Sequence, residues 1–125
     1  MLTLSVLPGQ FAVCRLAPDS TIPPWGLSEK FFSITKSKDE LTVVCSATEV
    51  PLNVQAERDW RALKVEGILD LRSTGILASL ACPLAKASVS IFAISTYDTD
   101  YVLVREKDLS QAVAVLREAG HAVSL

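Results

Sequence analysis

The chain has 125 residues, of which half are hydrophobic and 21% are charged, and its formal net charge is −2. This composition predicts one packed domain, or two very small lobes that share a core, and it excludes a disordered chain. The sequence has no block of lysine and arginine, which argues against a nucleic-acid partner, and no apolar stretch approaches the roughly 18 residues that a membrane-spanning helix needs.

The N-terminal half predicts short strands with little helix. In chain order we expect strands at residues 2–7, 10–16, 31–36 and 41–46, and a short helix within residues 50–59. Pro8 and Gly9 form the first turn. Two prolines and Gly26 within residues 19–26 prevent a long helix there. The start of the chain lacks the basic segment of a signal peptide, so we expect a soluble, cytoplasmic protein.

The C-terminal half predicts the order β-α-β-β-α-β. In chain order we expect a strand at 60–66, a loop at 67–73, a helix at 74–87, strands at 89–95 and 100–105, a helix that Gly120 ends, and a strand at 121–125. Ser73 is expected to cap the first helix, and Asp108 with Gln111 the second. Pro83 should bend or end the first helix. The strand at 89–95 is apolar on both faces, which predicts a central strand.

A weak internal repeat relates the two halves. When the chain is shifted by 60 residues, FFSITKSKDELTVV aligns with IFAISTYDTDYVLV, so that Phe32 falls on Phe92 and Val44 on Val104. We interpret this as two related lobes: residues 1–59 form an abbreviated lobe and residues 60–125 a complete one.

Three cysteines and one histidine give little sign of chemistry. The odd number and wide spacing of Cys14, Cys45 and Cys82 argue against disulfides and a zinc site, and their apolar neighbours predict buried, unreactive thiols. His121 follows a glycine that ends a helix, and we expect it to be exposed or on an edge strand. There is no phosphate-binding glycine-rich motif of the P-loop or dinucleotide type.

Two acidic residues lie in and beside the second hairpin turn. Asp98 and Asp100 are typical of turns, where aspartate bonds nearby amides, and contact with a ligand is about as plausible. An acid–base role with Lys64 or Lys86 is a weaker alternative. We therefore expect no enzyme activity, no metal and no cofactor.

The segment GILDLRSTGI, residues 67–76, is the most informative loop. It leads into a helix N-terminus, whose unpaired amides and partial positive charge suit a carboxylate such as that of a free amino acid. Gly75 allows close approach, and Asp70 could meet a ligand ammonium group. The alternative is that Ser73 only caps the helix and Gly75 only eases packing.

Residues 73–109, STGILASLACPLAKASVSIFAISTYDTDYVLVREKDL, resemble the ACT domains of the CASTOR-type arginine sensors and their bacterial relatives. The most specific part is ISTYDTDYVLVRE, residues 94–106, and KFFSITKSKDELTVV, residues 30–44, is similar to a piece of the sensors' first lobe. Aspartate kinase regulatory domains show a looser version. The resemblance implies an α+β, ferredoxin-like βαββαβ fold in tandem ACT-like lobes, with the first lobe abbreviated.

The same resemblance implies a small regulatory module that binds a free amino acid between lobes. The contacts it implies lie at the loop–helix junction, at the start of the following strand and, as second choices, around the hairpin turn. They are Ser73, Thr74, Gly75, Ile76, Ser90, Ile91, Thr96, Asp98 and Asp100. The sensors carry four lobes in one chain and this chain at most two, so we expect a homodimer. A protein-interaction domain of the same fold, without a small-molecule ligand, is the alternative.

Overall fold

A computed structural model describes residues 1–27 and 30–125 and divides the chain into two compact units. Unit 1 contains residues 1–8 and 61–125, and unit 2 contains residues 9–60. The first eight residues, assigned above to the first lobe, therefore group with the C-terminal part of the chain. Residues 28 and 29 of that predicted lobe lie outside the described residues.

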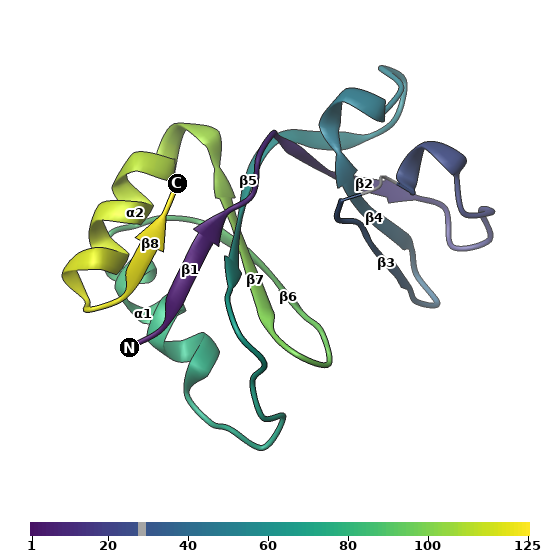
Figure 1. Cartoon of the computed structure of the whole chain (residues 1–125). Coiled ribbons are helices and arrows are strands. Elements are labelled where there is room, and N and C mark those ends of the chain that lie inside the picture. Colours follow the sequence, from purple (N-terminus) through teal and green to yellow (C-terminus); the bar gives the residue numbers. More distant parts are fainter. Residues whose placement is uncertain (28–29) are drawn as a thin grey trace. The chain divides into compact units, whose positions relative to one another are not determined.

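The elements follow one another as in Figure 1, and β5 contributes to both units. Strand β5 (Ala56–Val65) is divided after Trp60, and its C-terminal half belongs to unit 1. The other elements of unit 1 are β1 (Thr3–Val6), α1 (Ile76–Lys86), β6 (Ile91–Ser95), β7 (Asp100–Arg105), the 3-10 helix η3 (Glu106–Asp108), α2 (Leu109–Glu118) and β8 (Ala122–Ser124). Those of unit 2 are β2 (Phe11–Leu16), η1 (Pro24–Gly26), β3 (Ser33–Lys36), β4 (Leu41–Ser46), η2 (Ala47–Glu49) and the N-terminal half of β5.

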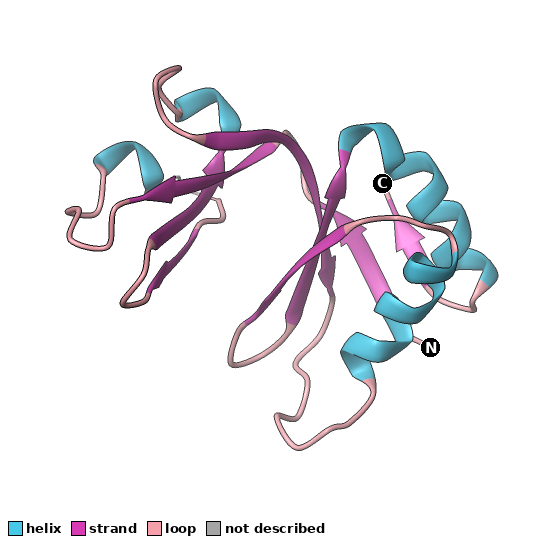
Figure 2. Ribbon diagram, turned by 180° about the vertical axis from the view of Figure 1, so that it is seen from behind, coloured by secondary structure: helices cyan, strands magenta, loops and turns pink. Residues whose placement is uncertain are grey.

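The sheet of unit 1 has the strand order β8-β1-β5-β7-β6. Both helices lie together on one side of it (Figure 2). The succession β5-α1-β6-β7-α2-β8 confirms the predicted ferredoxin-like βαββαβ fold. The unexpected strand is β1, which lies between β8 and β5, parallel to the first and antiparallel to the second. This pairing is the reason why the first residues belong to unit 1.

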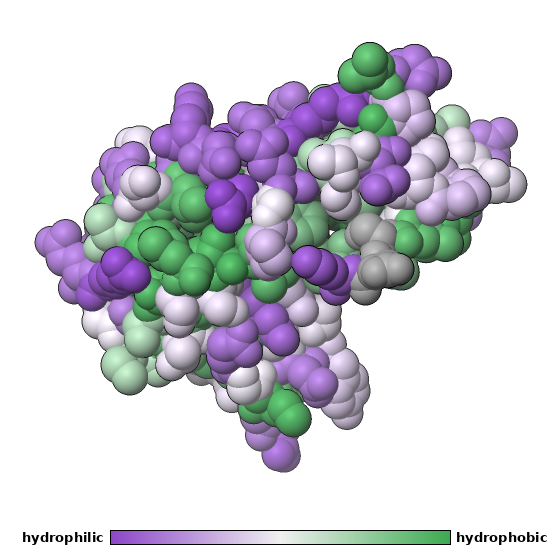
Figure 3. Space-filling model, turned by 45° about the horizontal axis from the view of Figure 1, so that its top comes forward, coloured by the Kyte–Doolittle hydropathy of each residue, from purple (hydrophilic) through white to green (hydrophobic). Residues whose placement is uncertain are grey.

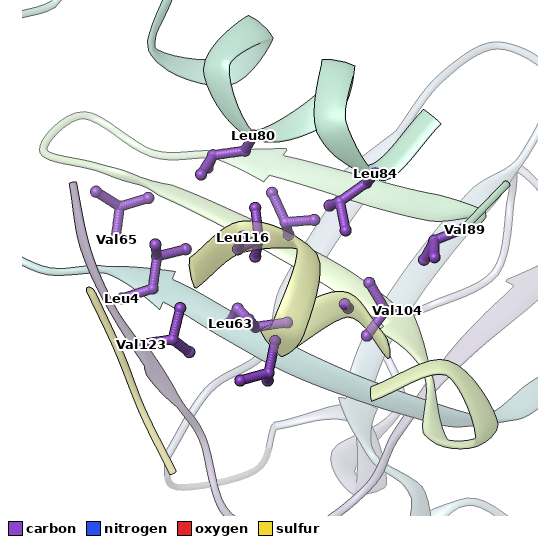
Figure 4. Close-up of a cluster of buried hydrophobic side chains, with 12 residues drawn as sticks. Leu4, Leu63, Val65, Leu80, Leu84, Val89, Val104, Leu116 and Val123 are labelled. Atoms are coloured by element: carbon purple, nitrogen blue, oxygen red, sulfur yellow. The ribbon is translucent and has the colours of Figure 1, made fainter. Parts of the chain in front are cut away.

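Apolar side chains from every layer of unit 1 form one core (Figure 4). Leu63 and Val65 alternate with polar residues along β5, as the period of a strand requires, and both are fully buried. Leu80 and Leu84 lie one turn apart on α1 and pack onto them. Leu116 covers the cluster from α2. Each helix thus has one buried apolar face in this core.

Unit 2 has the strand order β3-β4-β2-β5, with 3-10 helices where unit 1 has α-helices. Strands β3, β4, β2 and β5 of unit 2 correspond to β6, β7, β5 and β8 of unit 1. The strand order is therefore that of unit 1 without the inserted strand β1. The core of unit 2 contains Ala12, Cys14, Val43 and Cys45 on neighbouring strands, and Trp25 of η1 packs against it. The predicted abbreviation of the first lobe therefore concerns its helices, while its four strands are present.

The helix predicted within residues 50–59 is wrong. Residues 56–59 begin β5, and Ala56 and Glu57 pair with Cys14 and Val13 of β2. Cross-strand pairing outweighs local propensity here. The preceding loop is irregular, and the Arg58 guanidinium holds it through donated hydrogen bonds. These bonds go to the carbonyl oxygens of Val50 (3.1 Å), Pro51 (2.8 Å) and Val54 (3.0 Å).

The two hairpins of the internal repeat close with the same turn. In residues 37–40 the amide of Ser37 donates to the carbonyl of Glu40 at 2.9 Å, and the Ser37 hydroxyl accepts from the Glu40 amide at 3.2 Å. In residues 96–99 the amide of Thr96 donates to the carbonyl of Thr99 at 2.8 Å, and its hydroxyl accepts from the Thr99 amide at 3.2 Å. Both repeats thus place a hydroxyl side chain at the first turn position.

The turns also correct the length of the repeat. Ser33 lies opposite Val44 in the first hairpin, and Phe92 lies opposite Leu103 in the second. Equivalent residues are therefore 59 positions apart, whereas the sequence alignment gave 60. A shift of 59 sets Ser33 on Phe92 and Leu41 on Asp100, so the similarity of the letters favours 60, and only the cross-strand pairing fixes the value.

Strand β6 is an edge strand rather than the central strand predicted from its apolar faces. It pairs with β7 only among the described strands, and β7 lies between it and β5. The buried run Val102, Leu103 and Val104 marks β7 as the covered strand. Apolar residues on both faces of a strand therefore do not show whether the strand lies at the edge or in the centre of a sheet.

Other local predictions meet mixed outcomes. Cys14 and Cys45 are buried as expected, but Cys82 is exposed because it lies on the face of α1 opposite its buried leucines. A hydrogen bond from the Cys45 thiol holds the pKa of Cys14 below its usual value, and the same contact raises the pKa of Cys45. Gly120 ends α2 with φ of 100°, as predicted.

The predicted capping box of α2 does not form. Asp108 closes the 3-10 helix η3 in a helical conformation and makes no side-chain cap. Gln111 instead donates to the carbonyl of Ala87 at 3.3 Å.

Within the described residues, no helix is long and apolar enough to cross a membrane.

Candidate functional site

Unit 1 contains a hollow of about 290 Å³ between the loop that precedes α1 and the β6–β7 turn. Both segments are at the lower end of this unit in Figure 1. The lining comes from residues 69–71, 73 and 75–78 on one side and residues 95–100 on the other. The chain therefore brings together two segments that are about 25 residues apart in sequence.

Six of the nine residues predicted as ligand contacts line this hollow. They are Ser73, Gly75, Ile76, Thr96, Asp98 and Asp100. Thr74 is exposed beside them without lining it. Ser90 and Ile91 lie at the opposite end of β6 from the turn and are not part of the lining. The structure thus unites the loop and the turn, but it does not bring the start of β6 to them.

Several lining residues were missed because they are apolar. Leu69, Leu77 and Tyr97 line the hollow beside the predicted polar residues. A signal was present in the sequence: the loop at 67–73 carries Ile68, Leu69 and Leu71, and three large apolar side chains are unusual in a solvated turn. The hollow is therefore mixed in character, with apolar walls and polar groups at a few points, as ligand sites generally are.

Two hydrogen bonds join the loop, β5 and the turn. The amide of Leu69 donates to the carbonyl of Asp98 at 2.6 Å. The Thr99 hydroxyl donates to the carbonyl of Val65 at 2.5 Å, and Thr99 is only 7% exposed. Because a buried carbonyl without a partner costs free energy, these bonds fix the turn against the end of β5.

The N-terminus of α1 opens onto the hollow without a side-chain cap. Gly75 is the N-cap residue in the left-handed conformation, with φ of 79°, and in the part of the chain that the structure describes no side chain bonds the first-turn amides. The predicted cap by Ser73 is wrong, because α1 begins at Ile76 with Gly75 as its N-cap; Ser73 belongs to a separate turn, in which its amide donates to the carbonyl of Asp70 at 2.9 Å. Ile76, Leu77 and Ala78 line the hollow, so the uncapped first turn of α1 forms part of its wall.

The three aspartates at the hollow differ in their surroundings. Asp70 accepts from the Arg72 amide at 2.9 Å and forms a 3.2 Å ion pair with its guanidinium, and these bonds hold the pKa of Asp70 below its usual value. Asp100 accepts from the Ser95 hydroxyl at 2.6 Å. Among the described residues no hydrogen bond or ion pair involves the Asp98 carboxylate, which is exposed. Asp98 is therefore the carboxylate most accessible to a bound cation.

Two large side chains that line the hollow are exposed. Leu71 is 64% and Tyr97 80% exposed, and Ile68, which precedes the lining residue Leu69 in the chain, is 83% exposed. Hydrophobic residues also appear between hydrophilic ones on the face drawn in Figure 3. Within residues 1–27 and 30–125, no three histidine, cysteine or acidic side chains are grouped to hold a metal ion. The arrangement is suited to binding a small polar molecule.

Comparison with family models and curated proteins gives consistent matches. A model described as the ACT domain matches residues 55–118, and a second, described as an N-terminal domain, matches residues 9–53. The cytosolic arginine sensor for mTORC1 subunit 1 of Homo sapiens is 36% identical over 101 residues. That alignment covers 71% of this chain and 30% of the sensor, so the chain spans only part of this curated relative.

Solved structures show the same similarity. A protein from Agrobacterium tumefaciens has 35% sequence identity and a TM-score of 0.93, over 98% of this chain and 91% of that one. Aspartate kinase from Clostridium acetobutylicum has 13% identity and a TM-score of 0.69, over 93% of this chain and 34% of the kinase. At that identity the likeness to the kinase concerns the fold alone.

Proposed function

Because the chain belongs to the ACT domain family, we propose that it is a small regulatory module that binds a free amino acid in the hollow of unit 1. The observation that carries this proposal is the meeting of an uncapped helix N-terminus with an accessible carboxylate across one hollow. The volume of about 290 Å³ is close to the lower end of the range for ligand pockets, roughly 300–1,000 Å³, as a small ligand requires.

The two ends of an amino acid suit the two sides of the hollow. The amides of Ile76, Leu77 and Ala78 would bind the α-carboxylate, since they have no side-chain cap and lie at the positive end of the helix dipole. Asp98 would bind the ammonium group, and the Thr96 hydroxyl, which already bonds the amide and carbonyl of Thr99, could accept only one further hydrogen bond from it. Asp70 contributes less than the sequence predicted, because Arg72 already occupies its carboxylate.

Binding would act by shifting a population. A ligand stabilises the assembly or partner-competent state that it binds more tightly, by the difference between its two affinities. We propose a cytoplasmic homodimer without enzyme activity, in which Ser90 and Ile91 contact a ligand only through a second lobe. The relative from Homo sapiens is a cytosolic arginine sensor, which supports this location and an amino-acid ligand.

The second candidate is a protein-interaction domain that has no ligand. The exposed apolar residues Ile68, Leu71 and Tyr97 favour it, because exposed apolar patches mark protein interaction sites. In that case the hollow would be part of a contact surface, and no free amino acid would stabilise the fold.

Thermal melts against the twenty common amino acids separate the two candidates. A ligand at 100 times its dissociation constant stabilises a fold by about 2.7 kcal/mol, which raises Tm by several degrees. We expect Asp98→Asn to reduce this shift, while Asp19→Asn, an exposed carboxylate in unit 2, leaves it unchanged. If no amino acid at millimolar concentration raises Tm, the interaction domain replaces the amino-acid module.

A further inference from the structure

Helix α1 contains a carbonyl that its own backbone cannot satisfy. Pro83 has no N–H, so the carbonyl oxygen of Ser79, four residues earlier, loses its partner within the helix. The helix nevertheless continues to Lys86 rather than ending at the proline. His121 Nε2 lies 3.1 Å from the Ser79 oxygen, so an imidazole fills the position left by the missing amide.

The other ring nitrogen of His121 contacts the N-terminal strand segment. The amide of Leu2 donates to His121 Nδ1 at 3.1 Å. An amide N–H can only donate, so Nδ1 has to be the acceptor and the ring proton resides on Nε2, which then donates to Ser79. The predicted exposure of His121 is wrong: the residue directly precedes edge strand β8 but is buried, with 8% exposure. The two hydrogen bonds together specify one tautomer of a neutral ring.

The ring is held by its neighbours along the chain. The amide of His121 donates to the carbonyl of Leu116 at 3.0 Å, in the turn that ends α2. The amide of Ala122 donates to the carbonyl of Leu2 at 2.9 Å, which begins the parallel pairing of β8 with β1. His121 is thus fixed between the end of α2 and the start of the inserted strand, and its side chain reaches across to α1.

The contact with Ser79 leads directly to the hollow. Ser79 closes the first turn of α1, because its amide donates to the carbonyl of Gly75 at 2.9 Å and its hydroxyl to the carbonyl of Ile76 at 2.7 Å. Ile76, Leu77 and Ala78 lie within that turn and line the hollow. A group that holds the Ser79 carbonyl therefore holds the residue that anchors this wall.

We propose that His121 is a positioning residue, which in its neutral Nε2–H form ties the inserted N-terminal strand to α1 through the carbonyl that Pro83 leaves open. This tie sets the place of the first turn of α1, and thereby of the wall to which the ligand carboxylate binds. The tie between His121 and α1 is inferred from the hydrogen bonds alone. Only its effect on the ligand rests on the proposed function.

A double-mutant cycle tests the tie without any ligand. In Pro83→Ala the restored amide can donate to Ser79, so His121→Leu should lower Tm clearly less in the Pro83→Ala chain than in the natural chain. In the natural chain His121→Leu should also speed hydrogen exchange of the Leu2 amide at least tenfold. Equal Tm losses in both backgrounds would overturn the bond to Ser79, and an imidazole ¹⁵N spectrum with the proton on Nδ1 would overturn the tautomer.

The positioning role has its own readouts. The amide chemical shifts of residues 76–78 should move in His121→Leu and return toward their natural values when Pro83→Ala is added. If His121→Leu fails to fold, His121→Phe, which keeps a ring but has neither a donor nor an acceptor, is measured in the same cycle. Unmoved shifts in a variant that has lost the Leu2 bond would overturn the positioning role.

The ligand arm uses the amino acid that gives the largest shift in the melts of the natural chain. Its dissociation constant should rise at least threefold in His121→Leu and recover with Pro83→Ala. Unchanged affinity in His121→Leu would overturn the link to the hollow. If the natural chain binds none of the twenty amino acids, the proposed function fails, while the exchange, tautomer and chemical-shift measurements still decide the tie.

Discussion

At the scale of single residues, the Thr99 hydroxyl makes the clearest prediction. Thr99→Val keeps the shape of the side chain but removes the 2.5 Å bond to the buried Val65 carbonyl, so we expect a loss of about 1–3 kcal/mol in the free energy of unfolding. Thr74→Val, the same change at an exposed position of the nearby loop, should cost less than about 0.5 kcal/mol. Urea denaturation measures both, and equal midpoints would contradict the role of this bond.

Gly26 in unit 2 allows a second prediction at this scale. A Cβ at this position would lie 2.7 Å from Val43 Cγ1, which is closer than real Cβ contacts come. Gly26→Ala should therefore destabilise the chain by about 1–3 kcal/mol through overpacking. In a chain that already carries Val43→Ala the same change should cost clearly less, because the clashing methyl is gone. Additive losses in the double variant would show that the contact is not the cause.

At the scale of elements, the inserted strand β1 is predicted to be essential to unit 1. Leu4 is fully buried in its core, beside residues from β5 and β8. Leu4→Ala should cost about 2–5 kcal/mol, the usual loss for a buried leucine. Leu52→Ala, at a leucine that is 94% exposed, is the control and should stay within about 0.5 kcal/mol. Similar unfolding curves for the two variants would mean that β1 does not stabilise the fold.

Local patterns in the sequence predicted the elements of unit 1 better than their partners. The helical spacing of Leu80 and Leu84 was sufficient to place α1, since it reflects one buried face. The pairing of β1 with β8 joins residues almost 120 positions apart, and no local period records it. The same limit explains why β6 was wrongly predicted to be a central strand. An apolar strand pattern does not show whether other strands pair with it along one edge or along both.

The candidate site was predicted in part for a similar reason. Gly75 and Asp98 belong to residue types that carry a local signal, since turns and helix ends select them. Leu69 and Leu77 share the hollow with them because the loop bends back onto the turn through the bond from Leu69 to Asp98. That bond depends on tertiary structure, so the sequence signals an apolar loop but does not show that the loop faces the β6–β7 turn.

At the scale of the whole molecule, the strand edges bear on the expected homodimer. Exposed edges are usually protected by charges, proline or short length. Edge strand β8 has three residues, and edge strand β3 carries Lys36. In contrast, β6 reads IFAIS, with neither a charge nor a proline. Of these three edges, β6 is therefore the one on which a second copy would pair most readily.

A two-fold antiparallel pairing of β6 with its copy would place the exposed Ala93 at the centre, opposite itself. We expect the natural chain to sediment as a dimer of two 13.5 kDa chains. Ala93→Lys would set two like charges face to face and should yield monomers, because such pairs destabilise a sheet. Ala122→Lys, an exposed alanine on β8, is the matched control and should leave the dimer intact. A natural chain that sediments as a monomer at every concentration would refute the homodimer, and a dimer that survives Ala93→Lys would move its interface away from β6.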